Sequence, residues 1–261
     1  MSDKNLVGFS TGCLYRTDMS FNEKIDFIAK TGANAIELAF PMPEDIINWH
    51  WDWNGRIIEI INSFSFVSVH APWIDVSYPG VNPADKCIVD AVFEKLRYLC
   101  KDMLNIQGVV FHPDVIIDFG VFSNIEKKSI FLENMDSSKK SGKYPDEFRN
   151  YLGEYKNIGI VIDLFHTLEN DPEMGQAEEL MAIGDGRISH LHVSGVNSQT
   201  RHSLLYLADE PSQSAIIRGL DMMISPLSPI ILEGKLYGLG EIDTVDVAHK
   251  ELEFVRQLIA E

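Results

Sequence analysis

The sequence predicts a closed (β/α)8 barrel of the TIM type, built as one domain over residues 1–261. Short apolar runs alternate with amphipathic helical stretches along the chain, which indicates right-handed crossovers and a parallel sheet. Eight such units give about 33 residues each, and a (β/α)8 barrel typically needs about 250 in total. Because periodicity does not prove that a sheet closes, a doubly wound open sheet is the alternative.

The expected strands are apolar or β-branched runs, each followed by a polar loop. They are Val7–Gly12, Ala35–Phe40, Phe64–Pro72, Gly108–Pro113, Ser129–Met135, Ile158–His166, Ile188–Gly195 and Pro229–Gly234. Helical periodicity lies between them, at Phe21–Lys30, Arg56–Ser63, Lys86–Leu104, Asp146–Tyr155, Ala177–Ile183, Ser214–Met223 and Val245–Ala260. The interval Asp114–Lys128 has room only for a short helix, which we place around Phe119–Asn124.

Composition argues against several classes of protein. The chain has 22 Lys and Arg against 39 Asp and Glu, a net charge of −17, and such a surface repels phosphate backbones. Cys13, Cys87 and Cys100 are too few and too scattered for a disulfide framework or a cysteine zinc site. No signal-like segment or long apolar run is present, so we expect reduced thiols, a cytoplasmic location and no membrane span.

Six of the expected strands end in a residue type that binds metals. These residues are His70, His112, Glu133, Asp163, His192 and Glu233. Any one of them is more often a hydrogen-bonded or helix-capping residue, but the shared register of all six favours a common site. In a barrel, the last inward residue of each strand reaches the mouth where active sites form. A divalent cation would neutralise this set, and mixed imidazole and carboxylate ligands suit Zn²⁺, Mn²⁺ or Fe²⁺.

The same segments carry a resemblance to a known superfamily. They are Gly32–Leu38, Val69-His70-Ala71-Pro72, Phe111-His112-Pro113, Leu132–Asp136, Ile162–His166, Leu191-His192-Val193 and Ile231–Gly234. Their order on successive strands resembles the xylose isomerase-like TIM barrels, which include sugar isomerases and epimerases and the endonuclease IV-like enzymes (AP endonuclease family 2). The resemblance covers nearly the whole chain, and it is more specific for fold than for reaction.

The resemblance implies one or two metal sites, with Zn²⁺ or Mn²⁺ expected. The quartet of the isomerase and epimerase branch falls on Glu133, Asp163, His192 and Glu233. The endonuclease IV-like branch adds a neighbouring ion, whose ligands fall on His70 and His112 with Glu133 as the bridge.

A third metal of the endonuclease IV-like branch is less well matched. Its histidine, three residues after the aspartate, falls on His166, and an Asp-x-His motif should follow strand seven. His202 is present, but Thr200 stands where the aspartate belongs, so this site is expected to be incomplete. His166 then has two roles open to it, as a metal ligand or as a contact to a substrate oxygen.

Two chemistries and one inactive alternative follow. With the quartet alone, Glu133 and Glu233 would exchange protons with a sugar or a related small polyhydroxy carbonyl compound by way of an enediolate, assisted by His166. With two or three ions, a bridging hydroxide would attack a phosphodiester, as in abasic DNA. The acidic net charge and Thr200 favour the small substrate, whereas the pair His70 and His112 favours the hydrolase. A non-catalytic barrel that retains its ligands is the third hypothesis.

Other residues near the strand ends are weaker candidates. Trp73 is expected to wall the pocket, and Arg201 to bind an anionic or hydroxyl-rich substrate or to lie in a surface loop. Glu37 is expected to bind substrate or, preferably, to pair with Arg16 or another cation. His190 is interpreted as a deeper hydrogen-bonded residue behind His192. The aromatic run 49–53 either stacks on a ligand or covers a helix.

Overall fold

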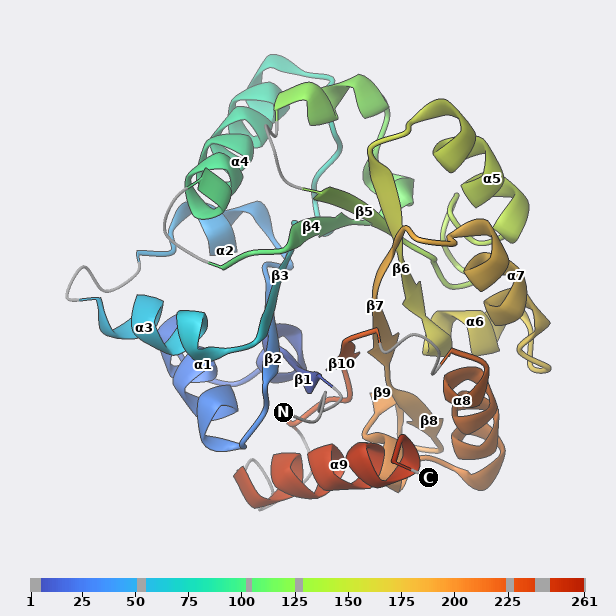
Figure 1. The fold of residues 1–261 in the computed structure, drawn as a ribbon. Helices are drawn as coiled ribbons and strands as arrows, with labels where there is room; N and C mark the ends of the chain where they lie inside the picture. The colour runs from blue at the N-terminus through green and yellow to red at the C-terminus, as the bar shows by residue number, and fades with distance from the viewer. Residues whose placement is uncertain are drawn as a thin grey trace.

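Eight parallel strands form a closed ring in this protein (Figure 1). The structure, a computed structural model, describes residues 6–50, 55–101, 105–124, 129–223, 228–237 and 245–260. The ring contains β1 (Val7–Ser10), β2 (Ala35–Ala39), β3 (Phe66–His70), β4 (Gly108–Phe111), β5 (Ser129–Glu133), β6 (Ile158–Asp163), β7 (Ile188–Val193) and β10 (Ile230–Leu232). Because β1 pairs with both β2 and β10, the sheet closes, and the (β/α)8 barrel is confirmed over the open sheet.

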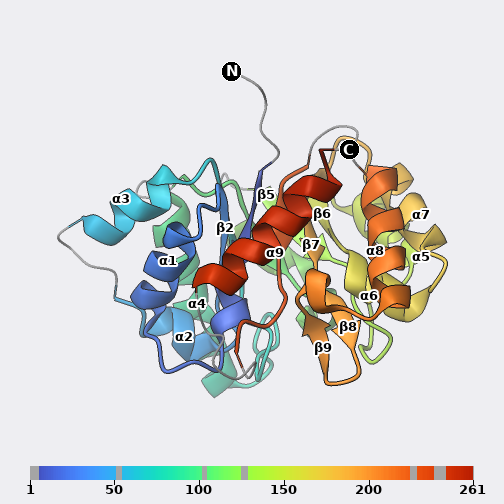
Figure 2. The ribbon, with the colours of Figure 1, turned by 90° about the horizontal axis from the view of Figure 1, so that it is seen from below.

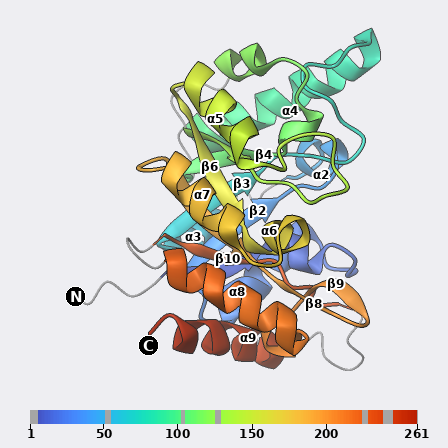
Figure 3. The ribbon, with the colours of Figure 1, turned by 90° about the vertical axis from the view of Figure 1, so that its right-hand side faces the viewer.

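Helices surround the barrel on its outer side (Figures 1 and 3). They are α1 (Phe21–Lys30), α2 (Pro43–Ile47), α3 (Arg56–Ser63), α4 (Pro83–Lys101), α5 (Pro145–Glu154), α6 (Leu164–Asn170), α7 (Gly175–Ile183), α8 (Glu210–Met223) and α9 (Val245–Leu258). Short 3-10 turns add η1 (Thr11–Leu14), η2 (Pro113–Val115), η3 (Phe119–Asn124) and η4 (Leu205–Leu207). The short helix expected in the fourth interval is η3. Among the described helices, none is both long and apolar enough to span a bilayer.

Local chemistry explains how several of these elements begin. Ser20 caps α1 through its hydroxyl, which accepts from the backbone N–H of Glu23, while the Glu23 carboxylate accepts from the N–H of Ser20. This reciprocal pair satisfies two donors that the first helical turn leaves free. In β1, a Cβ at Gly8 would lie 1.6 Å from the carbonyl oxygen of Ala35. Only glycine permits this close approach of β1 to β2.

The sixth strand is shorter than predicted. The sequence predicted a strand through His166, but β6 ends at Asp163 and α6 begins at Leu164. The physical reason is a helix cap, because Asp163 Oδ1 accepts from the backbone N–H of His166 at 2.8 Å. His166 therefore lies in the first turn of a helix, where its side chain still reaches the barrel mouth.

A small hairpin after β7 was not predicted. It consists of β8 (Gly195–Asn197) and β9 (Thr200–Ser203), and it lies at the end of the barrel away from the C-terminal turn of α9 (Figure 2). The Asn197 side-chain oxygen fixes its turn by accepting from the backbone N–H groups of Gln199 and Thr200, both at 3.0 Å. This hairpin carries His202 to the mouth.

The segment after the hairpin is fastened by a buried carboxylate of α9. Glu251 is fully buried, and its two oxygens accept from the backbone N–H groups of Leu205 at 2.6 Å and Tyr206 at 3.1 Å. Burial raises the pKa of Glu251 to about 7, although these two hydrogen bonds act in the opposite direction.

Replacing Glu251 with Gln should change how stability depends on pH. In the folded protein Glu251 keeps its proton up to about pH 7, whereas the unfolded chain releases it near 4.5, so the wild-type free energy of unfolding falls across this interval. The amide of the variant cannot ionise. Stability relative to the Gln variant should therefore drop by about 3 kcal/mol between these pH values. Urea unfolding at several pH values measures this, and parallel pH profiles would contradict it.

Candidate functional site

The six candidate ligands meet at the carboxyl ends of the barrel strands. His70, Glu133 and Asp163 are the last residues of β3, β5 and β6. His112 and Glu233 follow β4 and β10 directly, and His192 lies within β7. All six are buried except Glu233, whose side chain is 20% exposed. The strand register therefore brings together every residue that the sequence pattern selected.

Four of these residues form a converging donor set. One ligand atom from each of Glu133, Asp163, His192 and Glu233 lies within 4.8 Å of the others. The Nδ1 atom of His192 is 3.1 Å from Glu133 Oε1 and 3.6 Å from Glu233 Oε1. Within the described ranges, the buried Oδ2 atom of Asp163 receives no hydrogen bond. This set of three carboxylates and one imidazole nitrogen fits the ligand chemistry of a divalent cation, and this Asp163 oxygen is available to bind it.

The carboxylates of this set differ in the direction in which their surroundings shift the pKa. Burial raises the pKa of Glu233 to about 8, and the negative charges of Glu133 and Asp163 add to the rise. Burial likewise raises the pKa of Asp163 to about 6. Burial acts in the same direction on Glu133, but the charge of His192 and the hydrogen bond from His112 hold its pKa well below the usual range. The mutual repulsion of three carboxylates is the strain that a cation would relieve.

A second group shares Glu133 with the first. Glu133 Oε2 lies 2.9 Å from His70 Nε2 and 3.1 Å from His112 Nε2, while Oε1 faces His192. The two oxygens of one carboxylate thus point into two adjacent groups, as a bridging ligand does. Burial lowers the pKa of His112 to about 4, which leaves a neutral imidazole. The Trp73 ring packs against both histidines, with ring centroids 4.5 Å from His70 and 5.2 Å from His112.

The third group implied by the resemblance is not assembled among the described residues. His166 and His202 lie near each other, with ring centroids 5.7 Å apart, but neither joins a cluster of three ligand atoms in the described part of the chain. His166 Nδ1 is 2.9 Å from the carbonyl oxygen of Asn134, and His202 Nδ1 is 3.0 Å from Ser194 Oγ. The Thr200 hydroxyl contacts Lys235 Nζ at 3.0 Å instead of completing a site.

Two weaker candidates, Glu37 and Arg201, have specific neighbours. Glu37 was expected to pair with Arg16 or another cation, and the Arg16 part of this prediction is wrong because Arg16 is exposed. Glu37 is fully buried and contacts His190 and His192 instead. Arg201 lies on the rim, half exposed, in an ion pair with Glu169.

The aromatic run after β2 is described only in part. Trp49 is buried and packs on Phe21 and Phe40, with ring centroids 4.8 and 5.5 Å away, so it covers a helix. Trp51 and Trp53 lie outside the described residues.

Two supporting residues were missed at the sequence level. Asn134 fixes the end of β6, because its amide donates to the carbonyl oxygen of Asp163 at 3.0 Å and accepts from the Asp163 N–H at 2.7 Å. Ser68 donates its hydroxyl to Glu37 Oε2 at 2.9 Å. A signal existed for Ser68, which is the one hydroxyl residue inside the apolar strand Phe66–His70.

Comparison with solved structures identifies the fold. A D-tagatose 3-epimerase-like protein matches with a TM-score of 0.67 and 21% identity over 97% of each chain. D-psicose 3-epimerase from Clostridium cellulolyticum H10, solved with D-tagatose, matches at 0.64 and 13% identity over 97% of this chain and 99% of its own. The IOLI protein, solved with a zinc atom, matches at 0.65 and 16% over 97% and 98%. The likeness to these structures shows that the chain shares their TIM-barrel fold over nearly its whole length. No family profile and no curated protein sequence matches it.

Metal affinity should rise with pH between about 6 and 8. The pKa of Asp163 is about 6 and that of Glu233 about 8, so a cation entering the quartet must displace protons below these values. Each displaced proton weakens the apparent affinity by about tenfold per unit of acidification. Competition between the protein and a chromogenic chelator for Zn²⁺ measures this dependence. A flat profile over this range, or full metal content in the Glu133→Gln variant, would show that the quartet is not the site.

Proposed function

We propose that this protein is a divalent-metal-dependent enzyme that isomerises or epimerises a sugar or a related small polyhydroxy carbonyl compound. The observation that carries the proposal is the convergence of Glu133, Asp163, His192 and Glu233 on one point at the barrel mouth. The similar solved structures named as a D-tagatose 3-epimerase-like protein and a D-psicose 3-epimerase support a sugar as substrate. A bound divalent cation would polarise the carbonyl of such a substrate.

Two carboxylates of the quartet are suited to move the substrate proton. Their environments separate their proton affinities, since the pKa of Glu133 is held well below its usual range and that of Glu233 is raised to about 8. Such a division is how one site supplies both a base and an acid. Glu133 would accept the proton from the carbon beside the carbonyl, and Glu233 would return a proton to the carbon skeleton.

Residues around the quartet would orient the substrate. His166 projects from the first turn of α6, with Nδ1 3.5 Å from Glu133 Oε1, and would contact a substrate oxygen. Trp73 would wall the pocket beside His70 and His112, excluding water from the reacting carbon. Arg201 on the rim would bind a hydroxyl-rich or anionic end of the substrate.

Proton transfer at carbon can be detected without knowing the natural substrate. In D2O with Mn²⁺ or Zn²⁺, the wild-type protein should incorporate deuterium into a ketohexose at the carbon beside the carbonyl, followed by NMR or mass spectrometry. Glu233→Gln should slow incorporation by at least about 100-fold, because it removes a general acid or base. The Glu251→Gln variant, altered at a buried carboxylate of α9, should retain the wild-type rate. A panel of ketohexoses and aldoses that all stay undeuterated would refute the proposal.

A second candidate function is hydrolysis of a phosphodiester, such as the backbone at an abasic site. The observation that favours it is the His70–His112–Glu133 group, which shares Glu133 with the quartet. Two ions joined by that carboxylate would form a two-metal hydrolytic site. The net charge of −17 and Thr200 weigh against DNA as the substrate, so we expect no useful incision of abasic duplex DNA at physiological salt.

The two groups should bind metal with unequal affinity. Three carboxylates and an imidazole attract a cation more strongly than two neutral imidazoles and a shared carboxylate. A Zn²⁺ titration should therefore show two steps, and the double variant His70→Ala, His112→Ala should lose only the weaker. Loss of both ions, or of neither, would show that the division between the groups is wrong.

A further inference from the structure

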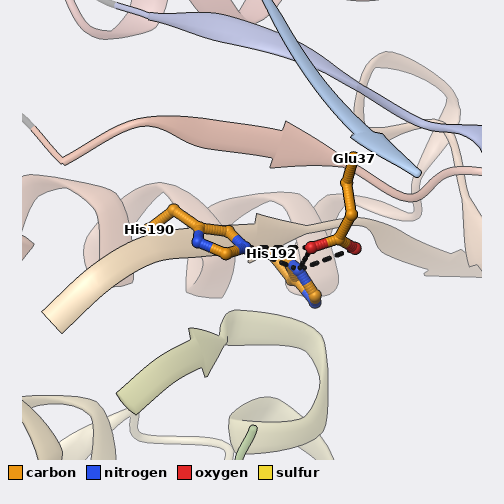
Figure 4. Close-up of side chains that lie close together, drawn as sticks. All are labelled: Glu37, His190 and His192. Atoms are coloured by element: carbon orange, nitrogen blue, oxygen red, sulfur yellow. Dashed lines mark hydrogen bonds and ion pairs between the residues drawn. The ribbon is translucent and has the colours of Figure 1, made fainter. Parts of the chain in front are cut away.

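Beneath the quartet lies a second cluster of buried polar groups, two of which the proposed chemistry does not use. Glu37 from β2 and His190 and His192 from β7 all have 0% exposure (Figure 4). Glu37 Oε2 is 3.1 Å from His190 Nε2, and Glu37 Oε1 is 3.2 Å from His192 Nε2. His192 belongs to both clusters, so its ring joins this cluster to the quartet.

The hydrogen-bond partners determine where the protons lie in this cluster. Glu37 Oε2 lies 3.1 Å from His190 Nε2 and 3.3 Å from His192 Nε2, and an ionised carboxylate only accepts hydrogen bonds. The Ser68 hydroxyl is one donor, at 2.9 Å. The Nε2 atoms of His190 and His192 lie 3.2 Å from each other, and both face this carboxylate. We assign hydrogen to both, because each can then donate to Glu37, whereas a buried lone pair facing a carboxylate is repulsive. His190 Nδ1 accepts from Ser189 Oγ at 2.9 Å, which agrees with this assignment.

This assignment has a consequence at the other side of the His192 ring. A histidine that binds a cation is neutral, and with hydrogen on Nε2 its lone pair lies on Nδ1. That is the nitrogen 3.1 Å from Glu133 Oε1 and 3.6 Å from Glu233 Oε1, inside the quartet. The opposite tautomer would turn the lone pair toward Glu37 and an N–H toward the site of the cation, where it blocks coordination.

We propose that Glu37 is a positioning residue that holds His192 in the Nε2–H tautomer and so presents Nδ1 to the cation of the quartet. This inference rests on the metal site of the proposed function but not on its reaction. His190 and Ser68 hold the carboxylate in place, since both donate to Glu37 Oε2. Oε1 lies 3.2 Å from His192 Nε2 and receives no hydrogen bond from the other described residues. A carboxylate that accepts from the free N–H of a metal-binding histidine fixes the ring and raises its basicity.

The cluster could instead hold an ion of its own, because its three ligand atoms lie within 4.8 Å of one another. That arrangement needs a lone pair on each Nε2 atom, and it forces His192 to bind an ion through both nitrogens at once. The hydrogen-bonded arrangement requires neither and satisfies His190 Nδ1 as well. We therefore favour positioning, and the ion is an outcome that the experiment can detect.

Glu37→Gln is the decisive variant. The amide keeps the size of the side chain, but its NH2 group replaces one acceptor oxygen and opposes one of the two imidazole N–H groups. Zn²⁺ affinity, measured by chelator competition at pH 7.5, should fall by about 10- to 100-fold, which is the usual effect of losing such a partner. Glu37→Asp, which keeps the acceptor, should restore part of the affinity. Glu251→Gln, also at a fully buried carboxylate, should leave it unchanged.

Histidine ¹⁵N NMR of the Zn²⁺-loaded protein reports the tautomer directly. In the wild type, His192 should show a protonated Nε2 with slow exchange and a metal-bound Nδ1, and Glu37→Gln should speed the exchange or move the proton. Equal affinity and equal spectra in the two proteins would overturn the inference, as would an ion in the wild type that His190→Gln removes. A wild type that binds Zn²⁺ but exchanges no substrate proton refutes only the proposed reaction.

Discussion

Repulsion among carboxylates buried in one barrel mouth is the constraint that organises this molecule. Glu133, Asp163 and Glu233 converge within a few ångströms, and Glu37 lies just beneath them. Without compensation, such a concentration of negative charge would oppose folding. Imidazoles at the ends of β3 and β4 and within β7 surround Glu133 and offset this repulsion. Glu133 is the residue in contact with both proposed metal groups.

The remainder of the barrel serves to hold these groups at fixed separations. Closure of the sheet sets the distance between strands, and the side chain of Asn134 binds both backbone groups of Asp163. A register shift between β6 and β7 falls beside His190, where the chain must bring two histidines to the interior. The strands and the residues that directly follow them thus carry the candidate metal ligands, whereas α6, the loops and the β8–β9 hairpin carry the residues that would meet a substrate.

The barrel and its six metal-ligand candidates could be predicted because both depend on a local pattern. An apolar run that ends in His70 or Glu133 is visible in the sequence without knowledge of its neighbours. The start of α6 was not predictable in this way, because Leu164 and Phe165 continue the apolar pattern of β6 and only the cap of Asp163 ends the strand. The partners of Glu37 escaped prediction because β2 and β7 are not adjacent in the ring, so only the closed interior joins them.

Asp163 divides its two oxygens between separate tasks. Oδ1 caps α6, and Oδ2 faces the quartet without a hydrogen bond in the described structure. Asparagine caps a helix as well as aspartate does, but it lacks the negative charge that a cation requires. Asp163→Asn would therefore keep the cap of α6 while it removes a negative charge from the proposed metal site.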